Sequence, residues 1–508
     1  MKIGDKPKPN YKPVDLQVRS AQGYSFQPGD TPAMNSALYP KFMGMLAEKN
    51  FADLIQNDDI RNKNASYIIG GRLFEAVVDA AGTGDYTTIQ QALDAGQKRI
   101  FIRNGTYVLK EDLIILSDIL IVGEDKYNTI IDCNNSSHQI TITSEALYST
   151  GTITTTVSSN VITGSGTSWS SNLSIGDYIV FNNNIYTITA VNSNTEIEIN
   201  EIYNGRTESS VAYKAGLFLT NINLENFTIQ NQNLSTQGEV IDINGLINST
   251  IKNIIIKDCD NAYSLGFDIV NFYKNNVENL DVSNCGLYGI RLNGGCSYNI
   301  FDNLFANNNG YSGIHIRGTY NIFSNIYVGN NHNSGLSLSI AHNNEFNNII
   351  AHSNYASSGG AIYILSSDKN NFNYIQSYNS NENGIYLAFS NENIFTTIHI
   401  ENSQESGFYF YSHAKRNIVL GGVLKNNGLK TNNTYSHIKF DAFSSDGATY
   451  SKIIGLSIIS DVANKAKYGI EEEDSNCDYN YYGGISFEGM ATSNIILSGV
   501  NSIIGDII

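Results

Sequence analysis

Short runs in which apolar and polar residues alternate make up most of the chain after about residue 100. In one run Ile314 and Ile316 flank His315, so the isoleucines of an extended strand point to one side and the histidine to the other. Glycine, asparagine or serine interrupts each run after a few residues, which is typical of short strands joined by turns. The alternation therefore predicts a chain of many short β-strands.

The runs recur with a period of about 23 residues. Consecutive segments superimpose, at 288–310, 311–333, 334–354, 359–382, 383–405 and 406–428. Glycine marks one corner, at Gly289, Gly313, Gly335, Gly384 and Gly407, with Ala361 in the same register. Asparagine marks another corner, at Asn299, Asn321, Asn344, Asn371, Asn393 and Asn417. The period predicts a solenoid with three short strands per turn, in which like residues stack about 4.8 Å apart and inward asparagines form ladders.

We therefore expect an all-β protein, a single-stranded parallel β-helix with additional segments around it. Apolar residues at helical spacing predict short helices within 32–57, and the stretch at 87–96 predicts a capping helix that starts at Thr87 or Thr88 and ends at Gly96. That helix would cover the open edge of the first turn. The expected domains are an N-terminal arm with short helices (1–73), the capping helix and first coils (74–144), a small inserted β domain (145–215), the main β-helix (216–492) and a last rung or C-terminal cap (493–508).

The composition argues against several kinds of partner. Lys and Arg number 31 against 48 Asp and Glu, and the net charge of −17 disfavours nucleic acid and anionic membranes. The start of the chain lacks the apolar segment of a Sec signal peptide, and no apolar run is long enough to predict membrane insertion. The five cysteines include no CxxC pair and the histidines no HExxH motif, so we expect no disulfide framework, metal or cofactor.

The repeat resembles the pectate-lyase-like right-handed β-helix superfamily over about residues 74–492, and VVDAAGTGDYTTIQQAL is similar to the opening of pectin methylesterases and many phage tailspikes. Right-handedness is implied by this resemblance. The helical N-terminal region, the insertion with its SGTSWSSNLSIGDY stretch and the missing signal peptide look most like a viral tailspike. The resemblance implies a homotrimer at the virion surface or outside the cell, attached to a virion tail through its N-terminal region, that binds host surface polysaccharide.

The sharper enzyme motifs of the superfamily are absent from the coils. The sequence has neither the RxPxxR element of pectate lyases, because every proline lies in the first forty residues, nor the GHG, paired DD and GxQDTL motifs of related enzymes. The resemblance therefore implies the fold and no particular reaction.

Carboxylates on neighbouring turns are the candidates for catalysis, because glycoside hydrolysis needs two carboxyl groups beside the scissile bond. Glu382 and Glu405 each precede a corner glycine by two residues and should be neighbours. His399 and Glu401 flank an inward isoleucine and should face outward together, with Glu405 just after them. Glu401 and Glu405 are the first choice, as acid and as nucleophile or base in either order, and Asp368 and Glu392 are the second pair. Solvated turn carboxylates are the competing interpretation.

A column of outward side chains should run along the first strand of successive turns, at Arg291, His315, Ser337, Tyr363, Tyr386 and Tyr409. Its three tyrosines predict a flat aromatic strip suited to stacking on sugar rings. A subunit interface is an equally good interpretation of the strip. Tyr378 and His399 complete the predicted substrate-binding set with Tyr363, Tyr386 and Tyr409.

Our hypothesis is a tailspike-like depolymerase, a glycoside hydrolase that binds and cleaves a cell-surface glycan. Two alternatives stay open. One is a non-catalytic receptor-binding or structural fibre. The other is a lyase or epimerase on a uronic-acid polymer, which needs a base such as His399, or a Lys or Arg near the acids, of which Lys415 and Arg416 are the nearest in sequence.

Overall fold

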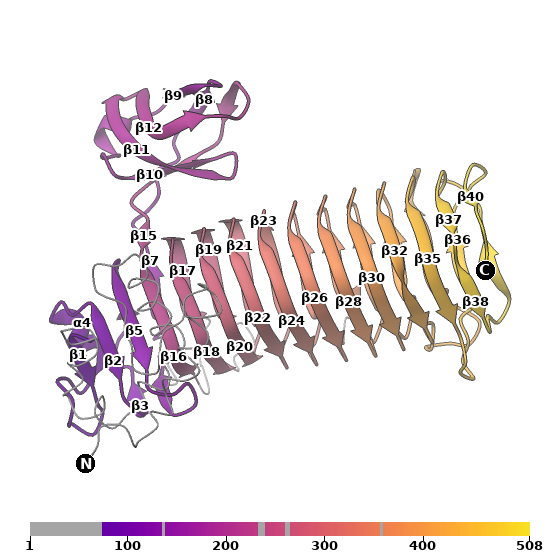
Figure 1. Cartoon of the computed structure of the whole chain (residues 1–508), viewed down its shortest axis with the longest axis horizontal. Coiled ribbons are helices and arrows are strands. Elements are labelled where there is room, and N and C mark those ends of the chain that lie inside the picture. The colour runs from indigo at the N-terminus through magenta and orange to yellow at the C-terminus, as the bar shows by residue number, and fades with distance from the viewer. Residues whose placement is uncertain (1–73, 135–137, 232–238, 260–264, 356–358) are drawn as a thin grey trace, which may run out of the picture. The chain divides into compact units, whose positions relative to one another are not determined.

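The computed structural model describes residues 74–134, 138–231, 239–259, 265–355 and 359–508. The helices expected within 32–57 lie outside these residues. Residues Val78–Ile508 form one compact unit, which holds nearly all of the described structure. Within that unit the strands of successive turns lie side by side (Figure 1).

Each turn of the main coil contributes one strand to each of two parallel sheets, here called sheet A and sheet B. Sheet A contains β16 (Ile222–Gln230), β18 (Thr250–Cys259), β20 (Asn276–Cys285), β22 (Ile300–Asn307), β24 (Ile322–Gly329), β26 (Glu345–His352), β28 (Asn371–Tyr378), β30 (Ile394–Glu401), β32 (Ile418–Lys425) and β35 (Lys452–Ile459). Sheet B contains β17 (Glu239–Ile247), β19 (Leu265–Tyr273), β21 (Ile290–Ser297), β23 (Ile314–Thr319), β25 (Leu336–Ser339), β27 (Gly360–Leu365), β29 (Asn383–Ala388), β31 (Phe408–Tyr411), β33 (Ile438–Phe443) and β36 (Tyr468–Glu472). These ladders confirm the parallel β-solenoid.

Shorter strands begin and end the coil. Before the insert lie β1 (Ala76–Val78), β2 (Arg99–Ile102), β3 (Gly105–Val108), β4 (Leu113–Ile114), β5 (Ile119–Gly123), β6 (Thr129–Asp132) and β7 (Ile140–Thr143). The coil resumes at β15 (Leu219–Thr220), and its last turns add β34 (Asp446–Gly447), β37 (Tyr481–Gly483), β38 (Ser486–Glu488), β39 (Ser493–Ile496) and β40 (Ile503–Ile504).

Each turn contains two strands in the structure, whereas the repeat pattern predicts three. The difference arises because each long strand of sheet A bends at its middle. Asn348, Tyr374 and Thr397 occupy this position in β26, β28 and β30, with φ values of 58°, 56° and 53°. A single left-handed residue redirects the strand, while the residues on either side of it keep their pairing with the next turn. The bent strand therefore supplies two of the three straight runs that the repeat pattern indicates.

An asparagine ladder joins the turns inside one corner. The side-chain Nδ2 of each asparagine donates to Oδ1 of the next at 2.9–3.3 Å, through Asn275, Asn299, Asn321, Asn344, Asn370, Asn393 and Asn417. The same Oδ1 atoms accept from backbone N–H groups, so every turn satisfies polar groups of its neighbour. The predicted ladder is confirmed, except that Asn371 was the wrong residue. Asn370 takes the ladder position, because the longer turn before it shifts the register by one, and Asn371 is the exposed first residue of β28.

A column of phenylalanine rings fills the core beside this ladder. Adjacent rings have centroids 4.7–4.9 Å apart and planes within 7° of parallel, through Phe301, Phe323, Phe346, Phe372 and Phe395. All of these side chains are fully buried. Identical residues in register thus stack along the coil with the spacing of paired strands.

The corner glycines are explained by close approach of the next turn. A Cβ atom on Gly313 would lie 2.7 Å from Asn331 Nδ2 and 2.8 Å from the carbonyl oxygen of Gly335. Gly289 and Gly407 face the equivalent asparagines Asn309 and Asn427 at similar distances. A second buried asparagine ladder, which the repeat analysis did not identify, therefore occupies the space that a side chain would need.

Gly313→Ala is expected to lower the free energy of unfolding by about 1–3 kcal/mol, because the added methyl forces backbone or the Asn331 amide to move in a close-packed corner. Chemical denaturation measures the change. Ser170→Ala, at an exposed position of the insert, is the control and should change stability by less than about 0.5 kcal/mol. Equal effects of the two substitutions would contradict the close-contact explanation.

The predicted capping helix is α4 (Ile89–Asp94). Thr88 is its N-cap and forms a capping box with Gln91, and Gly96 follows the helix with a left-handed φ of 75°. Ile89 and Ala92 are its buried residues. No helix in the described part of the chain has the length and apolar character needed to cross a membrane.

The inserted β domain is an antiparallel sheet that leaves the coil after β7 and returns before β15 (Figure 1). Its elements are β8 (Thr152–Thr155), β9 (Ser159–Ser165), the 3-10 helix η1 (Trp169–Ser171), β10 (Tyr178–Phe181), β11 (Asn184–Ser193), β12 (Glu196–Tyr203), β13 (Glu208–Val211) and β14 (Lys214–Gly216). Trp169 is fully buried in its core, where Nε1 donates to Tyr213 Oη at 3.0 Å. The domain boundaries given above stay predictions.

Candidate functional site

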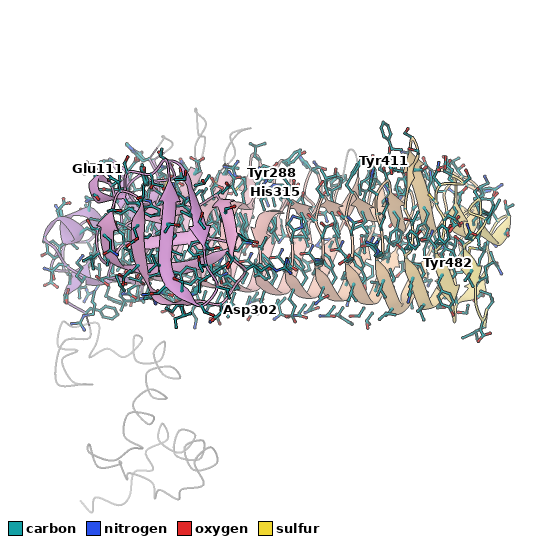
Figure 2. The ribbon with its side chains drawn as sticks, turned by 90° about the horizontal axis from the view of Figure 1, so that it is seen from above. Glu111, Tyr288, Asp302, His315, Tyr411 and Tyr482 are labelled. Atoms are coloured by element: carbon teal, nitrogen blue, oxygen red, sulfur yellow. The ribbon has the colours of Figure 1, made fainter. Side chains whose placement is uncertain are left out.

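The outward face of sheet B carries one side chain of a continuous row on every turn. The register places these residues next to one another in the order Asp242, Asp268, Arg291, His315, Ser337, Tyr363, Tyr386, Tyr409, Lys439 and Glu471, here called row 1. Because side chains alternate along a strand, Arg317 and Tyr411, two residues beyond row 1, also face outward. Figure 2 shows Tyr288, His315 and Tyr411 along one edge of the coil and Asp302 at the opposite edge.

The three predicted tyrosines lie together on this face. Tyr363 and Tyr386 stack with ring centroids 5.3 Å apart and planes 9° from parallel, and Tyr409 meets Tyr386 edge-on at 5.2 Å. Tyr409 Oη donates to Asp441 at 2.6 Å, and the Lys439 ammonium lies over the Tyr409 ring. Burial raises the pKa of Tyr386, so its hydroxyl is neutral at physiological pH. The tyrosines therefore present aromatic surface with hydrogen-bonding hydroxyls.

A pocket of about 250 Å³ continues the tyrosine column toward the N-terminal side of row 1. Tyr288, Tyr311 and Tyr363 line it together with His315, and serine and asparagine side chains complete the wall. The Tyr288 and His315 rings lie 5.0 Å apart, and His315 Nδ1 is 3.2 Å from Ser337 Oγ. Burial and the nearby charges of Arg317 and Arg291 lower the pKa of His315 to about 4, so the imidazole is neutral at pH 7. Aromatic walls with neutral polar groups are suited to a sugar ring.

Glu382 and Glu405 lie on adjacent turns, just before the sheet B strands that carry Tyr386 and Tyr409. The backbone N–H of Glu405 donates to the carbonyl oxygen of Glu382 at 3.1 Å, which places the two residues one above the other. The Glu382 carboxylate accepts from Gly359 N at 2.7 Å, on the preceding turn, whereas Lys430 Nζ is 2.8 Å from the Glu405 carboxylate. The two carboxylates of neighbouring turns therefore have different surroundings.

The surroundings of Glu382 act on its ionisation. Burial and the neighbouring charge of Glu405 raise the pKa of Glu382, against the opposing effects of the Gly359 N–H and of Lys430. The ammonium of Lys430 compensates the negative charge of Glu405 directly. A pair of carboxyl groups with one member shifted toward the protonated form is the arrangement that acid–base catalysis requires.

Glu401, the predicted first-choice partner of Glu405, has its contacts on sheet A. Glu401 ends strand β30 of sheet A, where its carboxylate contacts His399 Nε2 at 3.3 Å and Lys425 Nζ at 3.8 Å. Tyr378 pairs with Glu401 in register, and its ring meets that of His399 at 5.3 Å. The structure thus brings Tyr378, His399 and Glu401 together on sheet A, apart from the tyrosine column on sheet B.

The second pair, Asp368 and Glu392, lies in the corner between sheet B and sheet A. Asp368 accepts from the backbone N–H of Asn391 at 2.7 Å and is therefore in register with Asn391. Glu392 is 3.9 Å from Lys369 Nζ and 3.6 Å from Arg416 Nη1, and both partners are exposed. These contacts place the two acids on adjacent turns at different positions of the corner.

Sequence reasoning missed an acidic group at the other end of row 1. Asp242 and Asp268 are register partners, and Arg291 binds Asp268 through two hydrogen bonds of 2.8 and 2.7 Å. Burial, with the charges of Glu239 and Asp268, raises the pKa of Asp242. The sequence did contain a signal for this group. Asp242, Asp268 and Arg291 follow one another at 26 and 23 residues, which is close to the period of the repeat.

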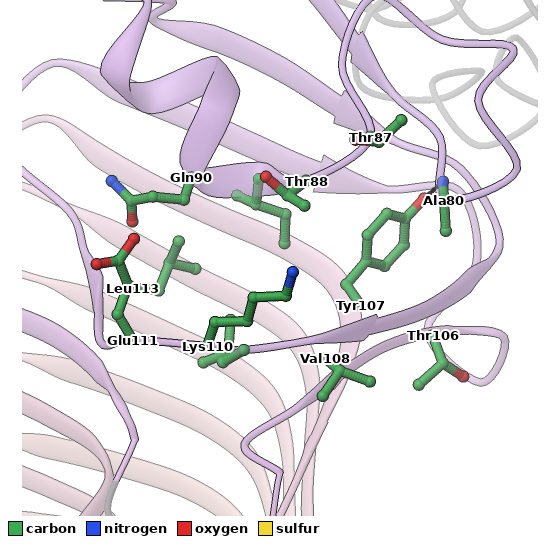
Figure 3. Close-up of a pocket in the computed structure, with 12 residues that line it drawn as sticks. Ala80, Thr87, Thr88, Gln90, Thr106, Tyr107, Val108, Lys110, Glu111 and Leu113 are labelled. Atoms are coloured by element: carbon green, nitrogen blue, oxygen red, sulfur yellow. Dashed lines mark hydrogen bonds between the residues drawn. The ribbon is translucent and has the colours of Figure 1, made fainter.

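A pocket of about 310 Å³ lies beside the capping helix (Figure 3). Ile89, Leu109 and Leu113 supply apolar walls, while Lys110 and Glu111 are its charged residues. It belongs to the first turn and lacks the repeated outward side chains of sheet B. In the described residues no three His, Cys, Asp or Glu side chains are grouped as metal ligands.

Comparison with protein-family models agrees with this architecture. A family model described as a right handed beta helix region matches residues 266–423. No curated protein matches the chain. Among solved structures, the chain is similar to the A-module of the mannuronan C-5 epimerase AlgE4 of Azotobacter vinelandii, with 15% identity, a TM-score of 0.49 and coverage of 82% of this chain and 93% of that chain.

Two phage proteins give similar matches. The Gp54 tailspike of Acinetobacter baumannii bacteriophage AP22, solved in complex with a capsular saccharide, has 9% identity, a TM-score of 0.43 and coverage of 82% of this chain and 73% of its own. The tailspike gp49 of Pseudomonas phage LKA1 has 12% identity, a TM-score of 0.44 and coverage of 80% and 75%. Because the family model and the parallel ladders coincide, residues 266–423 are a right-handed parallel β-helix.

Proposed function

We propose that the chain binds a polysaccharide along the outward face of sheet B and hydrolyses it with Glu382 and Glu405. The observation that supports this best is the adjacency of the two carboxylates to the tyrosine column. Glu382 and Glu405 directly precede the strands that present Tyr386 and Tyr409, and Glu382 binds Gly359, whose backbone lies against the Tyr363 ring. A glycan held on the tyrosines would therefore pass beside both acids.

In the proposed reaction Glu382 is the general acid and Glu405 the general base. Glu382, with its raised pKa, protonates the oxygen of the leaving sugar, and the ionised Glu405 takes a proton from a water that attacks the anomeric carbon. The glycosidic C–O bond breaks as the new C–O bond to water forms, so both products leave with complete hydroxyl groups. The tyrosines hold the chain in place during this displacement.

The side-chain contacts favour inversion of configuration. Glu382 reaches back to the preceding turn at Gly359, and Glu405 contacts Lys430 in the following turn. Side chains that point in opposite directions along the axis hold their carboxyl groups farther apart than the strand spacing of about 4.8 Å. Inverting enzymes need room for a water between the acids, with a separation of about 6.5–9.5 Å.

Incubation with capsule and envelope glycans tests the proposal. Hydrolysis produces new reducing ends, and proton NMR of the fresh product should show the inverted anomer. Retention of a glycan without any product would contradict hydrolysis and support the non-catalytic receptor-binding or structural fibre instead.

Tyr386→Ala is expected to weaken glycan binding by about 5–150-fold, because each stacking or hydroxyl contact with a ring contributes roughly 1–3 kcal/mol. Isothermal titration with the bound glycan measures the loss. Tyr374→Ala is the matched control, since this exposed tyrosine lies at the bend of a sheet A strand. Unchanged affinity after the Tyr386 substitution would contradict the binding face.

Activity should fall as pH rises through the raised pKa of Glu382, because only the protonated form donates a proton. Lys430 lowers that pKa, so Lys430→Met should move the alkaline limb of the kcat profile to higher pH. Lys369→Met removes another exposed lysine, in the far corner, and should leave the limb in place. A limb that moves to lower pH in Lys430→Met would contradict the assignment of Glu382 as the acid.

A lyase or epimerase on a uronic-acid polymer is the second candidate, favoured by the neutral His315 between Arg291 and Arg317. A neutral imidazole is able to remove a proton beside a carboxylate that arginine neutralises. Absorbance of an unsaturated uronate, in place of new saturated ends, would support the lyase. If His315→Gln no longer forms the unsaturated product while Glu382→Gln still forms it, His315 is the catalytic residue in place of Glu382.

The proposal includes a homotrimer at a virion surface. Exposed aromatic residues on successive turns support a subunit contact, since Tyr450 and Tyr479 stack at 4.9 Å, both about half exposed and both with left-handed φ. Light scattering should give three times the monomer mass. Attachment through the N-terminal region concerns residues 1–73, which lie outside the described part of the chain.

A further inference from the structure

A cleft of about 360 Å³ lies between the insert and sheet B. Its walls are Asn183 of the insert, the segment 293–297 of β21, and the segment 317–319 of β23 with Ile340 beyond it. His315 belongs to the sugar-sized pocket described above and Arg317 to this cleft, and the two residues are separated by one inward residue on the same strand. The cleft therefore continues the proposed glycan face.

The insert wall is held firmly against the coil. Asn182 and Asn183 form the two-residue turn between β10 and β11, with φ values of 48° and 61° that suit a type I′ turn. Behind this turn Val180 and Ile185 pack on Phe218, Ile247 and Tyr273 of the coil. The Tyr298 hydroxyl donates to Asn184 Oδ1 at 3.3 Å. These apolar and polar contacts together determine the position of Asn183 relative to the coil.

The opposite wall is open because a bulge in β21 carries two glycines. Gly294 and Gly295 have φ values of 63° and 64°, and the register with β23 shifts between Asn293 and Cys296. A Cβ on Gly294 would meet no atom within 4 Å, so the backbone here borders free space. The bulge thus exposes main chain to a ligand beside Arg317.

Arg317 is the cation that faces this space. Its side chain is exposed, and among the described residues no carboxylate forms an ion pair with it. Arg291, on the preceding turn, is instead neutralised by its two hydrogen bonds to Asp268. In a chain of net charge −17, an unpaired guanidinium within a lined cleft is suited to one negative group of a ligand.

We propose that this cleft is a subsite for an acidic sugar, whose carboxylate binds Arg317 while the Asn183 amide and the β21 bulge enclose the ring. The inference rests on the proposed function and names its substrate class, a polysaccharide with uronic or other carboxylated sugars. It also assigns the insert a role, as the wall that selects for this sugar several turns away from Glu382 and Glu405. The subsite acts by binding, so it changes affinity and leaves the chemical step alone.

The test compares a cleaved glycan with its carboxyl-reduced form. Carboxyl reduction should raise KM for the unmodified protein about tenfold or more with kcat unchanged, and Arg317→Gln should raise KM for the acidic glycan equally. Arg317→Gln should no longer distinguish the two glycans. Added salt should weaken binding of the acidic glycan to the unmodified protein and have little effect on Arg317→Gln. Asn183→Gly, which keeps the turn, should raise KM for both glycans by a smaller factor.

Arg416→Gln is the matched control, because this exposed arginine pairs with Glu392 in another corner, and its KM should not change. Equal KM values for both glycans in the unmodified protein would overturn the acidic subsite and leave hydrolysis standing. If no glycan is cleaved, titration with glucuronate and its methyl ester decides separately. If the protein binds glucuronate but not its methyl ester, and Arg317→Gln abolishes this binding, the subsite is supported even though the proposed hydrolysis fails. If the protein binds both probes equally, or neither of them, the subsite is overturned.

Discussion

Asn344→Leu is expected to lower the free energy of unfolding by about 3–6 kcal/mol, the largest stability change that we predict for a single side chain. Asn344 accepts from the backbone and side-chain N–H groups of Asn321 and donates to Gly318 O and Asn370 Oδ1. Leucine satisfies none of these groups, and all lie in a corner that water does not reach. Each buried group left without a partner costs about 1–3 kcal/mol. Denaturant titration followed by circular dichroism measures the change.

Asn371→Leu is the matched control, and it distinguishes the ladder from its exposed neighbour. Asn371 pairs through its backbone with β26 and β30, and its side chain is exposed at the start of the strand. Its replacement should change stability by less than about 0.5 kcal/mol. A comparable loss in Asn371→Leu and Asn344→Leu would contradict the register that places Asn370 in the ladder.

Glu382→Gln is expected to reduce kcat for glycan hydrolysis by about 10²–10⁴-fold, because glutamine cannot protonate the leaving oxygen. The hydrogen bond from Gly359 N remains possible to the amide oxygen, so the fold and the glycan affinity should be preserved. Glu405→Gln should cause a similar loss through the missing base. Initial rates of reducing-end release measure both variants, and titration with the intact glycan verifies that binding persists.

Glu401→Gln separates the two faces of the coil. Glu401 contacts His399 and Lys425 on sheet A, away from the tyrosine column, so its replacement should leave the rate within about twofold of the original. If Glu401→Gln loses activity while Glu382→Gln retains it, the reaction takes place on sheet A. Tyr378 and His399 would then be the first residues to substitute next.

The repeat pattern predicted the positions of strands, ladders and outward residues with few errors. Tyr363, Tyr386 and Tyr409 were placed in one column from their shared place beside a corner glycine, and the register agrees. The error at Asn371 arose where the turn before it is longer than its neighbours, because a period counted along the sequence does not show which residue absorbs the extra length. The pairing of Glu401 with Glu405 stays a prediction. The turn between these residues carries the chain from one sheet to the other, and the pattern does not give the angle of that turn.

The pattern of amino acids is sufficient to predict the class of fold, because alternating apolar residues at a constant period bury their side chains only when equivalent strands stack. Residue identity also determined the corners, where Gly313 leaves room for an amide and Asn321 satisfies the backbone of the preceding turn. Which residues meet between the insert and the coil depends on the folded chain, since Asn183 and Arg317 are far apart in the sequence and share no repeat position. Contacts of this kind depend on how the insert packs on the coil, and that packing follows from a few apolar contacts that no period encodes.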